Sequence, residues 1–258
     1  MYSELIIRPK ALQDTILYPD TARKLVAEAL GGINVPPLMF NRKEDGKTIT
    51  DRYWHEDPNH LTAKMGKPPV VIFDGGKGFV RLYMLGKTGR ELMDETASTI
   101  GAAVAKHVGG AYSFSMNEGM CKIEPRNTPT MYSARRIVMT KEAAKAKRYM
   151  FVPPQEVSDD IRSVLLRGLI SQARWLDEDT GGECNLEHLI PDEDSLGFFV
   201  ADGESAPILI NDKNYATGYS KLAFSMQLEL SGPWYAGNLR SRGYGGIRKL
   251  ILRDGHVN

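Results

Sequence analysis

The sequence is poor in cysteine and has no long apolar run, and both absences narrow the classes of protein that it can encode. Its two cysteines, Cys121 and Cys184, are far apart, which argues against a disulfide framework and against a cysteine zinc site. No stretch approaches the roughly 20 apolar residues that a membrane helix needs. The first residues lack the basic start and apolar core of a signal peptide. We therefore expect a cytoplasmic globular protein with no membrane partner.

Common catalytic and nucleotide-binding motifs are missing as well. The segment 74–78 lacks the spacing of a Walker loop, and the run that starts at Gly243 does not match a dinucleotide fingerprint. His55 and His60 lie five residues apart, but no third ligand accompanies them. No Ser-His-Asp arrangement can be inferred. We expect no metal and no cofactor.

The charge is balanced overall but distributed unevenly. The formal net charge is +1, yet residues 1–150 carry 23 Lys and Arg against 16 Asp and Glu, a net of +7, and the remainder has a net of −6. The stretch 177–212 holds eleven acidic residues and neither Lys nor Arg. Because acidic residues repel a polyanion, we expect this stretch to face away from any bound nucleic acid. A solvated loop is the simpler interpretation of the same stretch.

The most informative feature that is present is the glycine-rich segment, residues 237–249, which reads Gly-Asn-Leu-Arg-Ser-Arg-Gly-Tyr-Gly-Gly-Ile-Arg-Lys. Its arginines offer planar donors that match phosphate oxygens, namely Arg240, Arg242 and Arg248. Gly243, Gly245 and Gly246 allow a backbone nest for an anion, and Tyr244 offers a ring on which a base could stack. This combination predicts binding of a nucleic-acid backbone. An ordinary glycine turn before a last strand is the alternative.

Arg23 is a second candidate. It lies in the first turn of a helix expected over Pro19–Leu30, with Asp20 or Thr21 as the cap. A cation at this end opposes the helix dipole, but a bound phosphate would offset that cost. The long polar loop 41–69 interleaves basic and aromatic residues and suits single-stranded nucleic acid, with Arg42 and Arg52 as contacts. A solvated arginine and a disordered or subunit-docking loop are the alternatives.

A basic segment, residues 135–148, begins with Arg135 and Arg136. It holds six Lys and Arg residues and one acidic residue. Its second half is rich in alanine, which favours a helix. Lys141, Lys145 and Arg148 would then share one face and could contact the phosphates of a duplex. A solvated charged face is again the alternative.

The hydrophobic pattern predicts an α+β fold. Over residues 1–128 the order is strand, helix, strand, strand, helix, strand, which is the split βαβ or ferredoxin-like order, with residues 41–69 as an insertion. The expected elements are Leu5–Ile7, Pro19–Leu30, Val70–Phe73, Phe79–Leu85, Gly89–Val108 and Met120–Ile123. Residues 129–258 show one strong helix, Val157–Leu176, among short strands. We interpret the chain as tandem ferredoxin-like (RRM-like) domains, the second degenerate, with a basic helical insertion and a C-terminal glycine-rich loop.

The run Asn238–Ile247 lies near the C-terminus of this chain of two ferredoxin-like domains. It resembles the glycine-rich loop of the repeat-associated mysterious protein (RAMP) superfamily of CRISPR systems. The size and the basic segment are most similar to the repeat-processing endoribonuclease of type IV systems. The resemblance implies that the protein binds the stem-loop of a CRISPR repeat. It would cut precursor crRNA without metal, through attack of a 2′-hydroxyl, and stay on the mature crRNA as an effector-complex subunit.

Many relatives place a histidine on or near the first helix as the general base, where this sequence has Arg23. An arginine stays protonated, so it is a poor base but can hold a phosphate and neutralise its charge. We therefore expect Arg23 and Arg242 to clamp the scissile phosphate in a slow enzyme that turns over about once. A non-catalytic crRNA-binding RAMP subunit is the alternative, and a phage or plasmid structural protein is a third.

Overall fold

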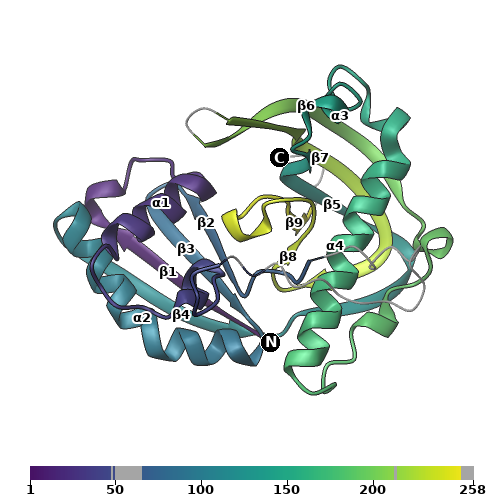
Figure 1. The fold of residues 1–258 in the computed structure, drawn as a ribbon. Coiled ribbons are helices and arrows are strands. Elements are labelled where there is room, and N and C mark those ends of the chain that lie inside the picture. Colours follow the sequence, from purple (N-terminus) through teal and green to yellow (C-terminus); the bar gives the residue numbers. More distant parts are fainter. Residues whose placement is uncertain (48, 50–65, 212–213, 251–258) are drawn as a thin grey trace.

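The structure is a computed structural model that describes residues 1–47, 49, 66–211 and 214–250. It is an α+β fold with two antiparallel sheets, and the glycine-rich segment lies between them (Figure 1). Within the described residues, no helix combines the length and the apolar character that crossing a membrane requires. Arg52 and the two histidines of the 41–69 loop lie outside the described residues.

The first unit contains six elements in the order that we predicted from the sequence. They are β1 (Tyr2–Pro9), α1 (Pro19–Ala29), β2 (Val71–Gly76), β3 (Phe79–Leu85), α2 (Gly86–Val108) and β4 (Tyr112–Gly119). The strands form one antiparallel sheet in the order β2-β3-β1-β4. α1 has Pro19 at its first turn and no side-chain cap, so the expected capping by Asp20 or Thr21 is wrong.

The closing strand of this unit is not the one expected. We predicted Met120–Ile123, but β4 ends at Gly119 and pairs with β1 along its whole length. β4 is an edge strand with exposed side chains such as Phe114 and Met116, so it lacks the alternation of buried residues that marks a strand in sequence. Residues from Lys122 onward belong to the other sheet.

The second unit is built on a five-stranded antiparallel sheet in the order β6-β7-β5-β9-β8. Its elements are β5 (Lys122–Thr140), α3 (Ala143–Ala146), α4 (Ser158–Asp179), β6 (Phe199–Asn211), β7 (Asn214–Ser231), β8 (Trp234–Tyr235), the 3-10 turn η6 (Arg240–Arg242) and β9 (Gly246–Lys249). This order does not repeat that of the first sheet. The division that we placed at residue 128 falls inside β5, and it stays a proposal.

The long helix of this unit is confirmed, whereas the basic helix is not. α4 buries the apolar face read from the sequence, including Ile161, Leu165 and Leu169. In the basic segment only the four residues of α3 are helical, and Lys141 and Arg148 lie outside them. A single turn cannot present Lys141, Lys145 and Arg148 as a stripe, so that prediction is wrong.

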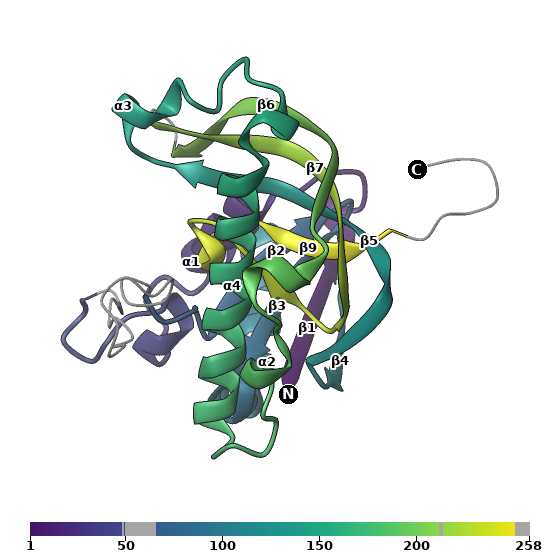
Figure 2. The ribbon, with the colours of Figure 1, turned by 90° about the vertical axis from the view of Figure 1, so that its right-hand side faces the viewer.

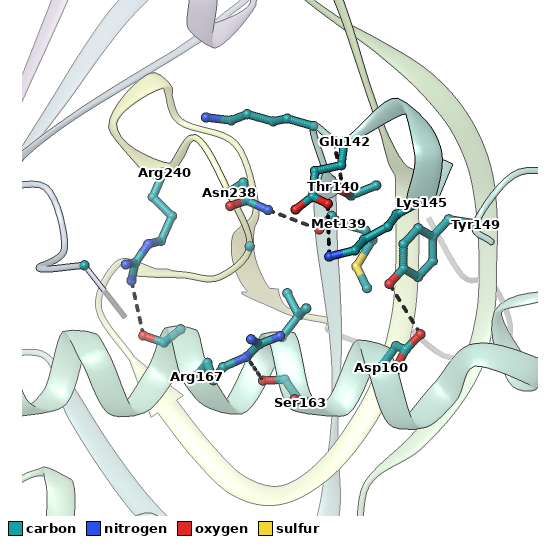
Figure 3. A pocket seen from close by; sticks show the side chains of 15 residues that line it. Met139, Thr140, Glu142, Lys145, Tyr149, Asp160, Ser163, Arg167, Asn238 and Arg240 are labelled. Carbon is teal, nitrogen blue, oxygen red and sulfur yellow. Dashed lines mark hydrogen bonds and ion pairs between the residues drawn. The ribbon is translucent and has the colours of Figure 1, made fainter. Parts of the chain in front are cut away.

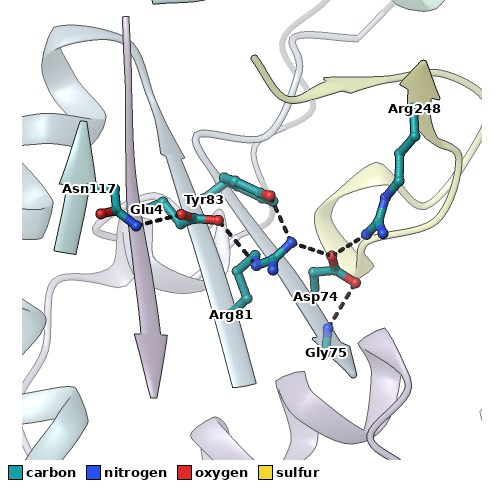
Figure 4. Close-up of polar contacts among 7 residues, drawn as sticks. All are labelled: Glu4, Asp74, Gly75, Arg81, Tyr83, Asn117 and Arg248. Atoms are coloured by element: carbon teal, nitrogen blue, oxygen red, sulfur yellow. Dashed lines mark hydrogen bonds and ion pairs between the residues drawn. The ribbon is translucent and has the colours of Figure 1, made fainter. Parts of the chain in front are cut away.

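Side chains from both units join across their boundary. At the start of α2, the backbone and hydroxyl groups of Thr88 donate to the carboxylate of Asp179 in α4. Arg248 of β9 pairs with buried Asp74 of β2 at 3.0 Å, and Asp74 also faces Arg81 (Figure 4). Figure 2 shows the glycine-rich segment passing between α1 and α4. These contacts fix the position of its arginines relative to the first unit.

Candidate nucleic-acid interface

A cavity of about 470 Å³ lies between the two units, and we call it the central cavity. Cations from four separate segments line it, namely Arg23, Arg42, Lys67, Lys141, Arg240 and Arg242. Among the described residues that line it, there is no Asp, Glu or His. Six cations without a lining carboxylate repel one another, and a polyanion that enters would relieve that repulsion.

Arg23 reaches this cavity from the second turn of α1, because the helix begins at Pro19, so the first-turn position that we predicted is wrong. Its guanidinium carbon lies 5.7 Å from the ring centre of Phe40 and 5.9 Å from that of Phe73, close enough for cation–π attraction. Burial lowers the pKa of Arg23, and the nearby charges of Arg242 and Arg42 lower it further. The aromatic support therefore holds a guanidinium that is partly desolvated and faces other cations.

Asn41 positions the residues on either side of it. Its backbone is left-handed, with φ of 54°. Its side-chain amide donates to the carbonyl oxygen of Val71 at 3.0 Å and accepts from the backbone nitrogen of Val70 at 2.9 Å. These bonds fasten the short turn that carries Phe40 to the start of β2, and they place Arg42 at the wall of the central cavity.

Arg240 and Arg242 are presented by the η6 turn. This turn lies between two left-handed residues, Leu239 and Gly243. The guanidinium of Arg240 donates to the carbonyl oxygen of Gly168 and to Ser171, each at 3.4 Å, so it lies against α4. The charge of Arg242 lowers the pKa of both Arg23 and Lys141, after the larger effect of burial. Arg23 and Arg242 therefore line one cavity, and their role as a phosphate clamp stays a prediction.

The glycines of this segment serve packing instead of forming a nest for an anion. A Cβ on Gly243 would come within 1.9 Å of the carbonyl oxygen of Phe73, and one on Gly245 within 1.8 Å of that of Ala236. The N–H groups of Gly243 and Gly245 donate to the carbonyl oxygens of Arg240 and Arg135. The nest predicted from Gly243, Gly245 and Gly246 is therefore wrong, because two of its three donors already have partners.

Tyr244 is fully buried, so its predicted role as a stacking surface is wrong for this structure. Its hydroxyl group donates to the carboxylate of Asp20 in α1. Burial raises the pKa of Asp20 from 3.8 to about 6, while Arg242, Arg136 and Arg23 act in the opposite direction. Tyr244 therefore fastens the glycine-rich segment to the helix that carries Arg23.

The remaining predicted cations lie elsewhere. Arg135, Arg136 and Arg248 line a different cavity of about 460 Å³. The guanidinium of Arg136 lies 4.2 Å from the ring centre of Tyr18, and Arg148 pairs with Asp160 at 2.6 Å. Lys145 lines a cavity adjacent to the central one. The predicted set is thus spread over several surfaces.

Three residues at or beside the site were not predicted. Lys67 belongs to the polar loop, and the basic character of that loop was the available signal. Asn238 lines the central cavity but carries no charge to mark it. Asp20 was assigned to capping, and only the three-dimensional arrangement places it among arginines.

Several solved structures share the fold of this chain. The chain superimposes on "Csf5, CRISPR-Cas type IV Cas6 crRNA endonuclease" with a TM-score of 0.63 at 21% identity, covering 96% of this chain and 98% of the other. A Cas6b crystal structure gives a TM-score of 0.58 at 12% identity, with 97% and 100% covered. A second crystal structure, of the CRISPR RNA processing endoribonuclease Cas6b, gives a TM-score of 0.54 at 11% identity. The match covers 96% of this chain and 99% of the other. The fold is therefore that of the Cas6-type proteins.

The sequence identifies the family within that class. Residues 5–251 match the family described as type IV CRISPR-associated endonuclease Csf5. The chain belongs to this family, and it is therefore a CRISPR-associated, Cas6-like endonuclease. No curated protein matches the chain.

Proposed function

We propose that this protein binds the stem-loop of a CRISPR repeat and cuts precursor crRNA at the phosphate held in the central cavity. The proposal depends on the meeting of Arg23 and Arg242 at one cavity whose described lining residues include no carboxylate. The two guanidinium groups come from different units, so they can grip one phosphate from two sides. We interpret the fold that presents these two guanidinium groups as tandem ferredoxin-like units, of which the second is degenerate.

The chemistry that this arrangement favours is attack of a 2′-hydroxyl on the adjacent phosphate, leaving a cyclic phosphate and a 5′-hydroxyl. Negative charge builds up on the phosphate oxygens as the new bond forms. Arg23 and Arg242 would neutralise that charge, and they need not accept a proton to do so. We further propose that cleavage needs no metal and that the protein stays on the mature crRNA as a subunit of an effector complex, inside the cell.

Single-turnover cleavage of a repeat hairpin tests this proposal. We expect Arg23→Ala and Arg242→Ala each to slow cleavage by about 10²–10³-fold, the usual cost of losing one donor to a developing oxyanion. Arg8→Ala is the matched control, because Arg8 is an exposed arginine on β1. Full activity in Arg242→Ala, or loss of activity in EDTA, would contradict the scheme.

The pH profile adds a second readout. The rate should rise with pH without the inflection near 6–7 that a histidine base gives. Since Asp20 titrates in the same range, the profile should be repeated in Asp20→Asn to separate its contribution. A purified protein that binds the repeat hairpin and leaves it intact would instead support the alternative, a non-catalytic crRNA-binding RAMP subunit.

A further inference from the structure

A second cavity, of about 530 Å³, adjoins the central one, and we call it the side cavity. Both cavities are lined by Lys141, Asn238 and Arg240. An RNA strand whose phosphate lies in the central cavity can therefore place a neighbouring nucleotide in the side cavity. A volume of this size is in the range of small-ligand pockets.

The two cavities differ in their chemistry. All the charged residues in the described lining of the central cavity are cations, whereas the wall of the side cavity also has the carboxylates of Glu142 and Asp160, together with Lys145 and Arg167. Carboxylates repel a phosphate but accept hydrogen bonds from the amino and imino groups of a base. Mixed donors and acceptors match the edge of a base, and unpaired nucleotides are the ones that proteins recognise in this way.

The polar side chains of the side cavity are held in place by their own contacts (Figure 3). The Nε group of Arg167 donates to the carbonyl oxygen of Ser163 at 3.1 Å, and Lys145 pairs with Glu142 at 3.0 Å. The hydroxyl group of Tyr149 donates to Asp160 at 3.3 Å. Asp160 also pairs with Arg148 at 2.6 Å, whereas Lys145 and Glu142 are exposed. The contacts of Arg167 and Asp160 therefore set the positions from which these two groups can meet a base.

We infer that the side cavity binds an unpaired nucleotide next to the scissile phosphate and reads its base through Asp160, Glu142 and Arg167. This inference rests on the proposed function, because it takes the RNA strand in the central cavity as its starting point. The central cavity would then supply affinity and charge neutralisation, and the side cavity would supply selectivity for the nucleotide beside the cut.

The test uses repeat hairpins with a 2′-deoxy nucleotide at the cut, so that binding is measured without cleavage. Each unpaired nucleotide that flanks the cut is changed in turn to the other three bases, and dissociation constants are measured by fluorescence anisotropy. We expect the unaltered protein to discriminate about tenfold at one flanking position, a usual cost of one wrong base. Arg167→Gln should reduce this discrimination to less than about threefold, because a base-edge contact is lost.

Two control variants match the substitutions. Arg162→Gln changes an arginine of the same helix that lines neither cavity, and it should keep the full discrimination. Lys145→Ala should weaken discrimination while Lys147→Ala, at an exposed position that lines neither cavity, should not. The exposed lysine pair keeps the test valid if Arg167→Gln fails to fold.

The outcomes separate the inference from the proposed function. If the protein neither binds nor cuts the repeat hairpin, the proposed function is overturned and the inference with it. If the protein cuts the hairpin but treats all flanking bases alike, or discriminates equally well in Arg167→Gln and Lys145→Ala, only the inference is overturned.

Discussion

The hydroxyl group of Tyr244 donates a hydrogen bond to the carboxylate of Asp20, and this contact joins the glycine-rich segment to the helix that carries Arg23. The carboxylate also lies near the guanidinium groups of Arg242, Arg136 and Arg23. The two proposed catalytic arginines therefore share one anionic neighbour. Their spacing depends on a bond between residues 20 and 244, which no local pattern in the sequence reveals.

Replacing Tyr244 by Phe would keep the buried ring and remove the hydroxyl group. We expect the free energy of unfolding to fall by about 1 kcal/mol, the usual contribution of such a hydrogen bond. Cleavage should slow more than RNA affinity weakens, because the charges of the arginines remain while their alignment loosens. Urea unfolding, single-turnover rates and dissociation constants measure the three quantities. A variant unchanged in all of them would show that the contact has no role.

The raised pKa of Asp20 predicts how stability depends on pH. In the folded protein this pKa is about 6, against an ordinary value of 3.8, so between these values the folded state binds a proton that the unfolded chain does not. The stabilisation that this proton gives the folded state is complete below the ordinary pKa of 3.8. It is lost as the pH rises through the folded-state pKa of about 6. Subtracting the unfolding free energy of Asp20→Asn isolates this effect. A difference that stays constant from about pH 4 to 7 would contradict the assignment.

Gly243 and Gly181 form a matched pair for testing the packing of the glycine-rich segment. Both have positive φ, 76° and 67°, so alanine is strained at either position. A Cβ at Gly243 would meet the carbonyl oxygen of Phe73, whereas a Cβ at Gly181 would have no heavy atom of another residue within 4 Å. We expect Gly243→Ala to cost about 1–3 kcal/mol more than Gly181→Ala in unfolding free energy, and only the former to slow RNA cleavage. Equal effects would mean that the contact with Phe73 is unimportant.

The cations of the central cavity predict a salt-dependent affinity for RNA. Lys67→Ala should weaken binding of all hairpins about equally and reduce the slope of log affinity against log salt by about 1, as loss of one phosphate contact does. Lys24→Ala is the control, since Lys24 is an exposed residue of α1 that pairs with Glu28 and does not line the cavity. A slope unchanged in Lys67→Ala would place the RNA backbone elsewhere.

Sequence patterns succeeded where a residue's surroundings are local. The helical period of Ile161, Leu165 and Leu169 located α4. Arg23 and Arg242, which we singled out by their charge, line one cavity, and their role at a phosphate stays a prediction. The sequence patterns failed where segments that are distant in the sequence determine whether a residue is buried. Tyr244 looks like an exposed ring in a flexible loop, but the packing of that loop between two units buries it. β4 was missed because an exposed edge strand has no buried face to create a pattern.

The most direct test of the central claim is a structure of the protein bound to a repeat hairpin with a 2′-deoxy nucleotide at the cut. Our account predicts that the scissile phosphate lies in the central cavity with its oxygens in contact with the guanidinium groups of both Arg23 and Arg242. A scissile phosphate bound at any other surface, with these two arginines facing solvent or one another, would contradict it.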